Sequence, residues 1–216
     1  MTVKAVTDIL ETLAPLSWAE DFDNVGLLVG DKNMEVSGVL VCLDSLENVV
    51  DEAINKNYNM IVSFHPIIFS GLKKLNREGY VSQVAIKAIQ NNIAIYSMHT
   101  ALDNAVLGVN HEICQRLGLE QIEVLMPNEE ITPKDPNGTL GMGRTGVLKD
   151  PLSEAAFLHL LKESFGTPYI RHSEFRGRDI KKIAVIGGSG SFGIEAAKIA
   201  KADVFVTADL KYHDFF

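Results

Sequence analysis

The stretch Met60-Ile-Val-Ser-Phe-His-Pro66 has a counterpart in Ile93-Ala-Ile-Tyr-Ser-Met-His99. Each stretch is a short apolar run that ends in a histidine, and such a run is typical of a strand that is covered on both faces. Residues that follow neighbouring parallel strands meet at one edge of a sheet. We therefore expect His65, His99 and the nearby Asp103 to lie in one crevice, where they would begin a metal or acid–base site.

Both His65 and Asp103 also have interpretations that involve no chemistry. Pro66 favours extended backbone at His65, which would aim the imidazole outward, but His65 is equally consistent with a buried histidine bonded to a backbone carbonyl. Asp103 could alternatively cap the helix that follows. If the two side chains do meet, an imidazole with a carboxylate suits Zn, Fe, Mn or Ni and leaves positions open for water.

Around these runs the sequence alternates between strand and helix patterns. This β-α-β-α-β-α order is typical of a mostly parallel sheet with flanking helices. Asp44 and Ser45 offer caps for one of the helices, and Gly118 is placed to end the last of them. The predicted strands span residues 38–43, 60–64 and 93–98, with a short strand after the polar turn at residues 18–24, and the predicted helices span residues 3–13, 46–57, 81–91 and 105–117.

The stretch from Met126 to Gly138 holds three prolines and several turn-forming residues, so it is the best candidate for a domain boundary. After it the pattern restarts, with predicted strands at 143–148, 169–172, 181–186 and 204–207 and predicted helices at 153–165, capped by Ser153, and at 192–201. The sequence thus predicts an α/β fold of two related domains, residues 1–125 and 126–216, each with a mostly parallel mixed sheet flanked by helices.

Composition restricts the partners and the compartment. The net charge of the 216-residue chain is -8 and no block of Lys or Arg occurs, which argues against nucleic acid or an anionic membrane as a partner. Cys42 and Cys114 lie in apolar surroundings and form no Cys-x-x-Cys motif, which favours free thiols in a reducing compartment. No signal sequence and no apolar run of about 20 residues occurs, so we expect a cytoplasmic protein.

Two further stretches resemble known functional motifs. Gly188-Ser-Gly190-Ser-Phe-Gly193 matches the dinucleotide-binding pattern, but few residues follow it. It leaves three interpretations open: a nicotinamide or flavin site, an anion contact, or a tight strand-to-helix turn. The stretch from His111 to Gln115 begins like H-E-x-x-H but lacks the second histidine, and His159 and His172 stand in contexts typical of the protein surface or a strand end.

Five ordered blocks resemble the NIF-three-like family, whose members are often labelled GTP cyclohydrolase 1 type 2 homologues. The resemblance runs from about residue 5 to the last residue. It implies two related α/β domains around a dinuclear metal site and assembly into a toroidal homohexamer. The blocks are W-A-E-D-F-D-N-V-G-L-L-V-G-D at 18–31, S-F-H-P-I-I-F at 63–69, H-T-A-L-D at 99–103, G-M-G-R-T-G at 141–146 and T-A-D-L-K-Y-H-D-F-F at 207–216.

The resemblance assigns roles residue by residue. His65 matches the second histidine of the family's H-H-P block and Asp103 the aspartate of its H-T-x-x-D block, and both are metal ligands there. His99 would lie beside the metals, and His213 aligns with a histidine near the pocket. This chain departs from the pattern at Phe64, where the first histidine of H-H-P is absent. It also lacks the closing G-H-x-x-x-E block, so we expect it to be incomplete at the C-terminus relative to the family.

The leading hypothesis is a metal-dependent hydrolase that acts on a small-molecule substrate through metal-activated water, with His99 or His213 shuttling protons. The GTP cyclohydrolase activity itself is implied by the resemblance alone. A metal-binding scaffold or regulatory protein without turnover is the alternative. A third hypothesis, a nucleotide-cofactor oxidoreductase, depends on the glycine motif.

Overall fold

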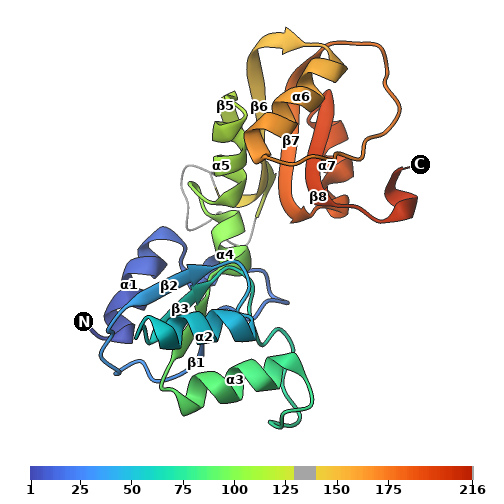
Figure 1. Cartoon of the computed structure of the whole chain (residues 1–216). Helices are drawn as coiled ribbons and strands as arrows, with labels where there is room; N and C mark the ends of the chain where they lie inside the picture. The colour runs from blue at the N-terminus through green and yellow to red at the C-terminus, as the bar shows by residue number, and fades with distance from the viewer. Residues whose placement is uncertain (129–139, 216) are drawn as a thin grey trace. The chain divides into compact units, whose positions relative to one another are not determined.

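The computed structural model of the chain describes residues 1–128 and 140–215 (Figure 1). The chain divides into two compact units, Met1–Leu102 and Asp103–Phe216, each with one four-stranded sheet. The predicted α/β class is confirmed. The division falls earlier than the expected boundary at 125/126, since both helix α5 (Val109–Arg116) and the strand at 120–127 contact the second sheet. The proline-containing stretch at 126–138 lies, from residue 129 onward, outside the described residues.

The sheet of the first unit has the order β1-β4-β3-β2. Strands β2, β3 and β4 are parallel and β1 runs antiparallel to β4, so the expectation of a mostly parallel sheet is confirmed for this unit. The pairing register places Cys42, Ser63 and Ser97 side by side at the carboxyl ends of the parallel strands. The four strands are β1 (Gly26–Val29), β2 (Val39–Cys42), β3 (Met60–Ser63) and β4 (Ala94–Ser97).

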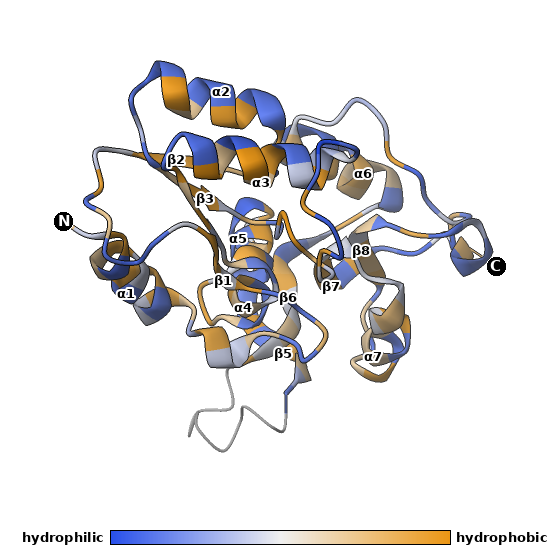
Figure 2. Ribbon diagram, turned by 90° about the horizontal axis from the view of Figure 1, so that it is seen from below, coloured by the Kyte–Doolittle hydropathy of each residue, from blue (hydrophilic) through white to orange (hydrophobic). Residues whose placement is uncertain are grey.

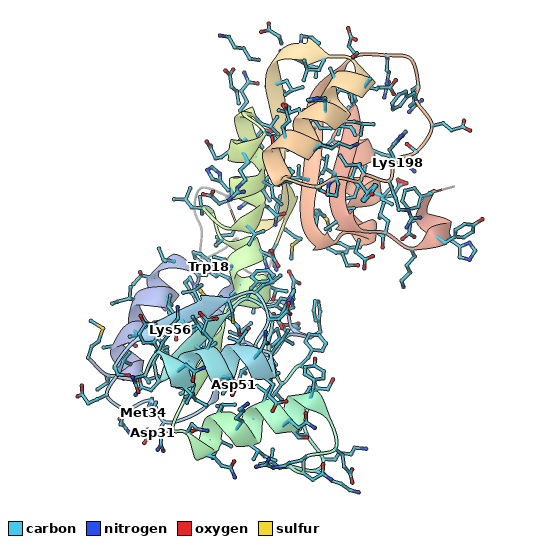
Figure 3. The ribbon with its side chains drawn as sticks, viewed as in Figure 1. Trp18, Asp31, Met34, Asp51, Lys56 and Lys198 are labelled. Atoms are coloured by element: carbon cyan, nitrogen blue, oxygen red, sulfur yellow. The ribbon has the colours of Figure 1, made fainter. Side chains whose placement is uncertain are left out.

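Three helices accompany this sheet: α1 (Val3–Leu13), α2 (Glu47–Asn55) and α3 (Tyr80–Gln90), with a short 3-10 turn η1 (Leu16–Trp18) after the first. Figure 2 shows hydrophobic and hydrophilic residues interleaved along α2 and α3. Their apolar residues, such as Val50 and Val84, pack with the strand residues Ile61 and Ile95 in one core. On the polar side, Asp51 of α2, labelled in Figure 3, pairs with Lys87 of α3 at 2.5 Å.

The predicted helix at 105–117 corresponds to α5 (Val109–Arg116), and a further short helix, α4 (His99–Asn104), precedes it. Helix α4 was not predicted. The separation occurs at Gly108, whose extended backbone (φ -87°, ψ -165°) interrupts the helical path and forms the N-cap of α5. Gly118 adopts a positive φ of 65° just after α5, which agrees with its predicted position at the helix end.

The sheet of the second unit has the order β5-β6-β7-β8, and only its β7–β8 pair is parallel. The expectation of a mostly parallel sheet is therefore wrong for this unit. Strand β5 was not predicted, because it alternates charged and apolar residues on a half-exposed surface. Residues 169–172, which were predicted as a strand, belong to no regular element. The strands are β5 (Glu120–Pro127), β6 (Gly141–Leu152), β7 (Ile180–Ser189) and β8 (Val204–Asp209).

Helix α6 (Glu154–Phe165) packs on the sheet of the second unit through Phe157 and Leu161. Ser153 caps it as predicted, since its side chain accepts a hydrogen bond from the amide of Ala156. The remaining elements are the 3-10 turn η3 (Ser191–Gly193), helix α7 (Ile194–Ile199) and the 3-10 turn η4 (Tyr212–Phe215).

Gly143 and Gly166 offer a test of how closely the second unit is packed. Both have left-handed backbone, at φ 71° and φ 61°. A Cβ at Gly143 would lie 2.7 Å from Ile186 Cγ1 and 2.9 Å from the Val185 carbonyl oxygen, whereas a Cβ at Gly166 would meet nothing within 4 Å. We expect Gly166→Ala to lower the free energy of unfolding by about 1–2 kcal/mol and Gly143→Ala by about 2–5 kcal/mol. Urea unfolding of both variants measures the difference, and equal losses would show that the close approach at Gly143 relaxes freely.

Candidate functional site

The carboxyl ends of β2, β3 and β4 bring three polar residues to one edge of the first sheet. Asp44, His65 and His99 each stand two residues beyond the register-matched Cys42, Ser63 and Ser97. Backbone pairing continues past the strand ends, since the His65 amide donates to the Leu43 carbonyl at 3.0 Å and the His99 amide to the Phe64 carbonyl at 2.9 Å. The expected approach of His65 and His99 is observed: their ring centres are 5.5 Å apart.

The imidazole of His65 is oriented by a carboxylate. Its Nδ1 lies 2.8 Å from Oδ1 of Asp44, and the two side chains are 46% and 49% exposed. An ionised carboxylate only accepts hydrogen bonds, so in the neutral imidazole the proton is on Nδ1 and the lone pair is on Nε2. His65 is therefore not the buried, carbonyl-bonded histidine of the alternative interpretation.

A second carboxylate orients His99. Nδ1 of His99 lies 2.8 Å from both carboxylate oxygens of Asp23, whose side chain is fully buried. Asp23 also accepts hydrogen bonds from the Thr100 amide, at 3.1 Å, and from the Thr100 hydroxyl, at 2.5 Å. Burial acts to raise the pKa of Asp23, but the hydrogen bonds from Thr100, His99 and Asn24 outweigh it and hold that pKa below its ordinary value. Asp23 is thus a carboxylate ion at neutral pH.

The backbone of His99 has a φ of 24°, which is unusual for a residue other than glycine. Such a conformation costs about 1–3 kcal/mol and persists where the surroundings impose it, often at a functional site. Here the Asp23 carboxylate holds the side chain and the Phe64 carbonyl holds the amide. The local fold therefore fixes the position of this imidazole at an energetic cost.

Phenylalanine rings surround the two imidazoles. The Phe64 ring centre lies 5.1 Å from that of His65 and 5.5 Å from that of His99, in edge-on arrangements. The ring centre of Phe69 lies 6.3 Å from that of His99. The ring centre of Phe22 in turn lies 6.4 Å from that of Phe69. Phe64 thus fills the space beside both imidazoles with a ring that donates no lone pair.

The other two predicted site residues belong to the second unit. Asp103 lies near the end of α4 and is 8% exposed, and its backbone carbonyl accepts a hydrogen bond from Nδ2 of Asn110 at 3.1 Å. Because Gly108 is the N-cap of α5, Asp103 does not cap that helix. His213 lies on the exposed turn η4, where its ring meets that of Tyr212 at 5.3 Å.

Asp23 and Asp44 are the site residues that reasoning from the sequence missed. Asp44 was expected to cap α2, but the N-cap residue of that helix is Leu46, and no side chain donates or accepts a capping hydrogen bond there. Asp23 stands in the polar turn before β1, and the antiparallel pairing of Gly26 with Ser97 brings that turn to the carboxyl end of β4. Counting two residues past the matched strand ends would have identified Asp44. Identifying Asp23 requires knowing that β1 pairs with β4.

The donor chemistry of this edge suits a divalent metal only in part. Two imidazoles with Nδ1 bonded to carboxylates match the usual arrangement of metal-binding histidines. Within residues 1–128 and 140–215, however, no group of three or more His, Cys, Asp or Glu side chains is arranged to hold a metal ion. The two oriented imidazoles can each accept a proton or donate to a cation through Nε2.

The glycine motif at 188–193 forms the turn between β7 and α7. A Cβ at Gly190 would lie 2.5 Å from the Thr207 hydroxyl oxygen, and one at Gly193 would overlap the terminal methyl of Ile186. Gly188 has a φ of 69°. The positive φ at Gly188 and the close approach at Gly190 therefore give these two glycines a structural role in the turn between β7 and α7.

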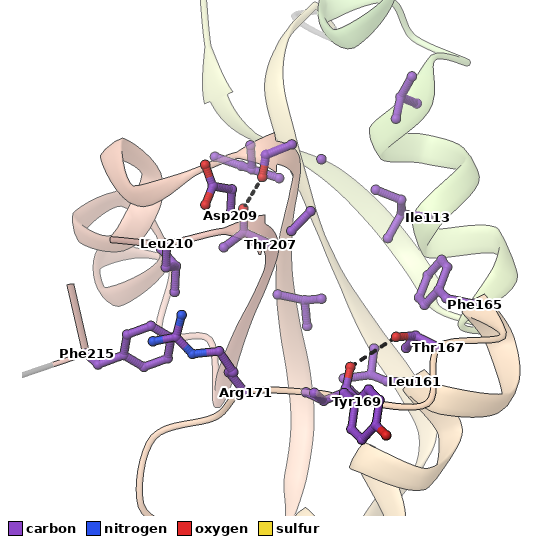
Figure 4. Close-up of a pocket in the computed structure, with 17 residues that line it drawn as sticks. Ile113, Leu161, Phe165, Thr167, Tyr169, Arg171, Thr207, Asp209, Leu210 and Phe215 are labelled. Carbon is purple, nitrogen blue, oxygen red and sulfur yellow. Dashed lines mark hydrogen bonds between the residues drawn. The ribbon is translucent and has the colours of Figure 1, made fainter. Parts of the chain in front are cut away.

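A cavity of about 670 Å³ lies in the second unit, lined by α5, α6, β7, β8 and the η4 turn (Figure 4). Its walls are mainly apolar, with Arg171 and Asp209 as charged groups. The Arg171 guanidinium carbon lies 4.4 Å from the ring centre of Phe215, and the Thr207 hydroxyl donates to the Gly188 carbonyl at 2.8 Å. None of the predicted site residues is among the described residues that line it.

Neither cysteine takes part in the site, and both are free thiols, as predicted. Burial raises the pKa of Cys42, and it raises the pKa of Cys114 to about 11, so neither thiol is activated as a nucleophile. Among the described residues, no helix has the length and apolar character needed to cross a membrane.

Comparison with known proteins covers the whole chain. The family model described as Duf34/NIF3 (NGG1p interacting factor 3) matches residues 1–216. A protein of Clostridium acetobutylicum named GTP cyclohydrolase 1 type 2 homolog is 36% identical over 213 residues, which cover 99% of this chain and 78% of the relative.

Solved structures agree in fold. The Staphylococcus aureus protein SA1388 aligns with a TM-score of 0.90 and 32% identity, covering 99% of this chain and 81% of that one. A Bacillus cereus protein related to NIF3 aligns with a TM-score of 0.90 and 25% identity, covering 99% of this chain and 84% of that one.

Proposed function

Because this chain belongs to the Duf34/NIF3 family, we propose that it binds a divalent metal ion and acts as a metal-dependent hydrolase on a small-molecule substrate. The name that its relatives carry, GTP cyclohydrolase 1 type 2 homolog, supports a hydrolytic activity. The observation that carries the proposal is the hydrogen bond from His65 Nδ1 to Asp44, which leaves Nε2 of an accessible imidazole ready for a cation.

His65 and Asp103 are the proposed metal ligands, and an imidazole with a carboxylate suits Zn, Fe, Mn or Ni. When bound, such an ion supplies Lewis acidity and lowers the pKa of a water molecule towards about 7. Asp44 orients His65 for this role. His99 and His213 are the two candidate proton carriers, and Asp23 keeps the proton of His99 on Nδ1 so that Nε2 accepts.

The partners and the compartment are part of the same proposal. An acidic chain without a cationic block is suited to a small-molecule substrate rather than to nucleic acid. We also propose that the protein is cytoplasmic and that it forms a hexameric ring. Sedimentation of the purified protein tests the ring directly. A monomer at all concentrations would contradict the ring without affecting the metal site.

Metal analysis tests the proposed ligands. We expect the purified protein, incubated with Zn²⁺ and desalted, to retain the metal, and we expect His65→Ala and Asp103→Asn to lose most of it. His159→Ala is the matched control, because His159 is an exposed histidine on α6 whose neighbour is Glu163. Unchanged zinc content in both ligand variants would refute the assignment.

A substrate screen then separates an enzyme from a scaffold. We expect metal-dependent turnover of a nucleotide, a phosphoester or a cyclic amide by the protein, and its loss in His65→Ala. Retained metal with no turnover on any of these classes would favour a metal-binding scaffold or regulatory protein.

A further inference from the structure

The proposed function makes no use of the cavity in the second unit. All of the described residues that line it lie between Val109 and Phe215, so it is formed within that unit. None of them is a proposed metal ligand or proton carrier. Its volume of about 670 Å³ is in the range of small-molecule sites, whereas the voids left by ordinary packing are rarely larger than a water molecule.

The walls of this cavity are apolar and partly aromatic. Ile113 of α5, Leu161 of α6 and Val206 of β8 contribute aliphatic side chains. Phe165 and Tyr169 add aromatic rings, and these two residues are 38% and 87% exposed. Large rings left in water beside an apolar cavity favour a ligand that covers them, because the ligand removes apolar surface from water on both sides.

A cation without a counter-ion belongs to this apolar lining. The guanidinium carbon of Arg171 lies over the ring of Phe215, 4.4 Å from its centre, as Figure 4 shows. Within residues 1–128 and 140–215, Arg171 has no ion pair or hydrogen bond. Stacking occupies the face of a guanidinium and leaves its in-plane N–H groups available. Arg171 is therefore held at the cavity with donors that can bind an anion.

The second charged group of the lining, Asp209, restricts which anion fits. In the described part of the chain its carboxylate has no ion-pair partner either. A phosphate with two negative charges would meet this repulsion with a single cation to offset it. A carboxylate carries one charge, and its planar shape matches the guanidinium of Arg171 in a bidentate pair. The charges of the lining thus favour a carboxylate over a phosphate.

We propose that the cavity binds an aromatic carboxylate. The ring system of the ligand occupies the apolar space beside Phe165 and Tyr169, and its carboxylate pairs with Arg171. Phe215 supports this pair because its ring holds the guanidinium at the cavity. The site uses no residue of the first unit, so the proposal is independent of the metal-binding function.

Calorimetric titration with naphthylacetate tests the proposal, with naphthylacetamide as a neutral ligand of nearly the same shape. We expect the carboxylate to bind the purified protein at least about tenfold more tightly than the amide, because only the carboxylate forms a charge-assisted pair with Arg171. Methyl NMR spectra locate the ligand. We expect shifts at Ile113 and Val206 and none at Ile61, which lies in the core of the first unit.

Variants of the two charged residues test how the anion is recognised. We expect Arg171→Gln to abolish the preference for the carboxylate while binding of the amide changes little. Arg176→Gln is the matched control, because Arg176 is an exposed cation five residues further along that does not line the cavity. Asp209→Asn is expected to tighten carboxylate binding by about two- to fivefold, since it removes a like charge. Thermal unfolding of each variant checks that the fold is retained.

The contrary outcomes are distinct. No binding of naphthylacetate at millimolar concentration would overturn the proposal, and so would methyl shifts confined to residues outside the cavity. Equal affinity for the carboxylate and the amide, or equal losses in Arg171→Gln and Arg176→Gln, would refute recognition of the anion by Arg171. None of these results bears on the metal-binding function, which the zinc content of the His65 and Asp103 variants tests separately.

Discussion

Replacing Arg144 with alanine is expected to lower the free energy of unfolding by about 3–5 kcal/mol. Arg144 belongs to the second unit and is only 2% exposed. Its guanidinium donates to the carbonyls of Gly141 and Ala105, each at 2.7 Å, and of Gly143 at 2.8 Å. Without it, buried carbonyls lose a charged donor, and each such loss costs about 1–3 kcal/mol.

Urea unfolding measures this loss, with Arg116→Ala as control because Arg116 is exposed on α5. Arg144→Lys is expected to recover only part of the stability, since an ammonium group cannot match the planar fork of a guanidinium. A loss below about 1 kcal/mol for Arg144→Ala would show that water replaces the guanidinium without penalty. It would also remove the structural explanation for the arginine in the block at 141–146.

Replacing Phe64 with histidine is expected to tighten Zn²⁺ binding by at least about tenfold. The Phe64 ring already lies beside both imidazoles, at 5.1 Å from His65 and 5.5 Å from His99. A third imidazole at this position adds a nitrogen donor to the two that Asp44 and Asp23 orient. Competition for Zn²⁺ with a chromophoric chelator measures the gain.

Phe69→His is the matched control for this substitution. Phe69 also meets the ring of His99, but at 6.3 Å, and it is 51% exposed. We expect it to change zinc affinity much less than Phe64→His does. Equal effects of the two substitutions would mean that any added surface histidine captures zinc, and no gain at Phe64 would place the cation elsewhere.

The strands of the first unit were predictable because their apolar runs are short, continuous and bounded by polar turns. Residues 60–64 and 93–98 were predicted within one or two residues of β3 and β4. In the second unit the same reasoning missed β5, whose charged residues alternate with apolar ones, and it placed a strand at 169–172 where no regular element exists. A half-exposed strand has a weak hydrophobic signal, and its partner supplies the missing stabilisation.

Helix α4 was missed in the sequence for a different reason. His99 has a positive φ and yet begins the helix His99–Asn104, a combination that local propensity does not favour. Two hydrogen bonds to distant residues hold it, from the His99 amide to the Phe64 carbonyl and from His99 Nδ1 to Asp23. Long-range contacts of this kind override local preferences and leave no periodic pattern.

The family and the α/β class follow from the order of residues alone, because motif spacing and hydrophobic periodicity are properties of the linear chain. His65 and His99 were identified in the same way, as polar residues directly after apolar strands. Their carboxylate partners, Asp23 and Asp44, emerged only from the folded chain. A hydrogen bond between residues 76 positions apart, as between His99 and Asp23, depends on strand pairing and register, and these are formed by cooperative packing of the whole sheet.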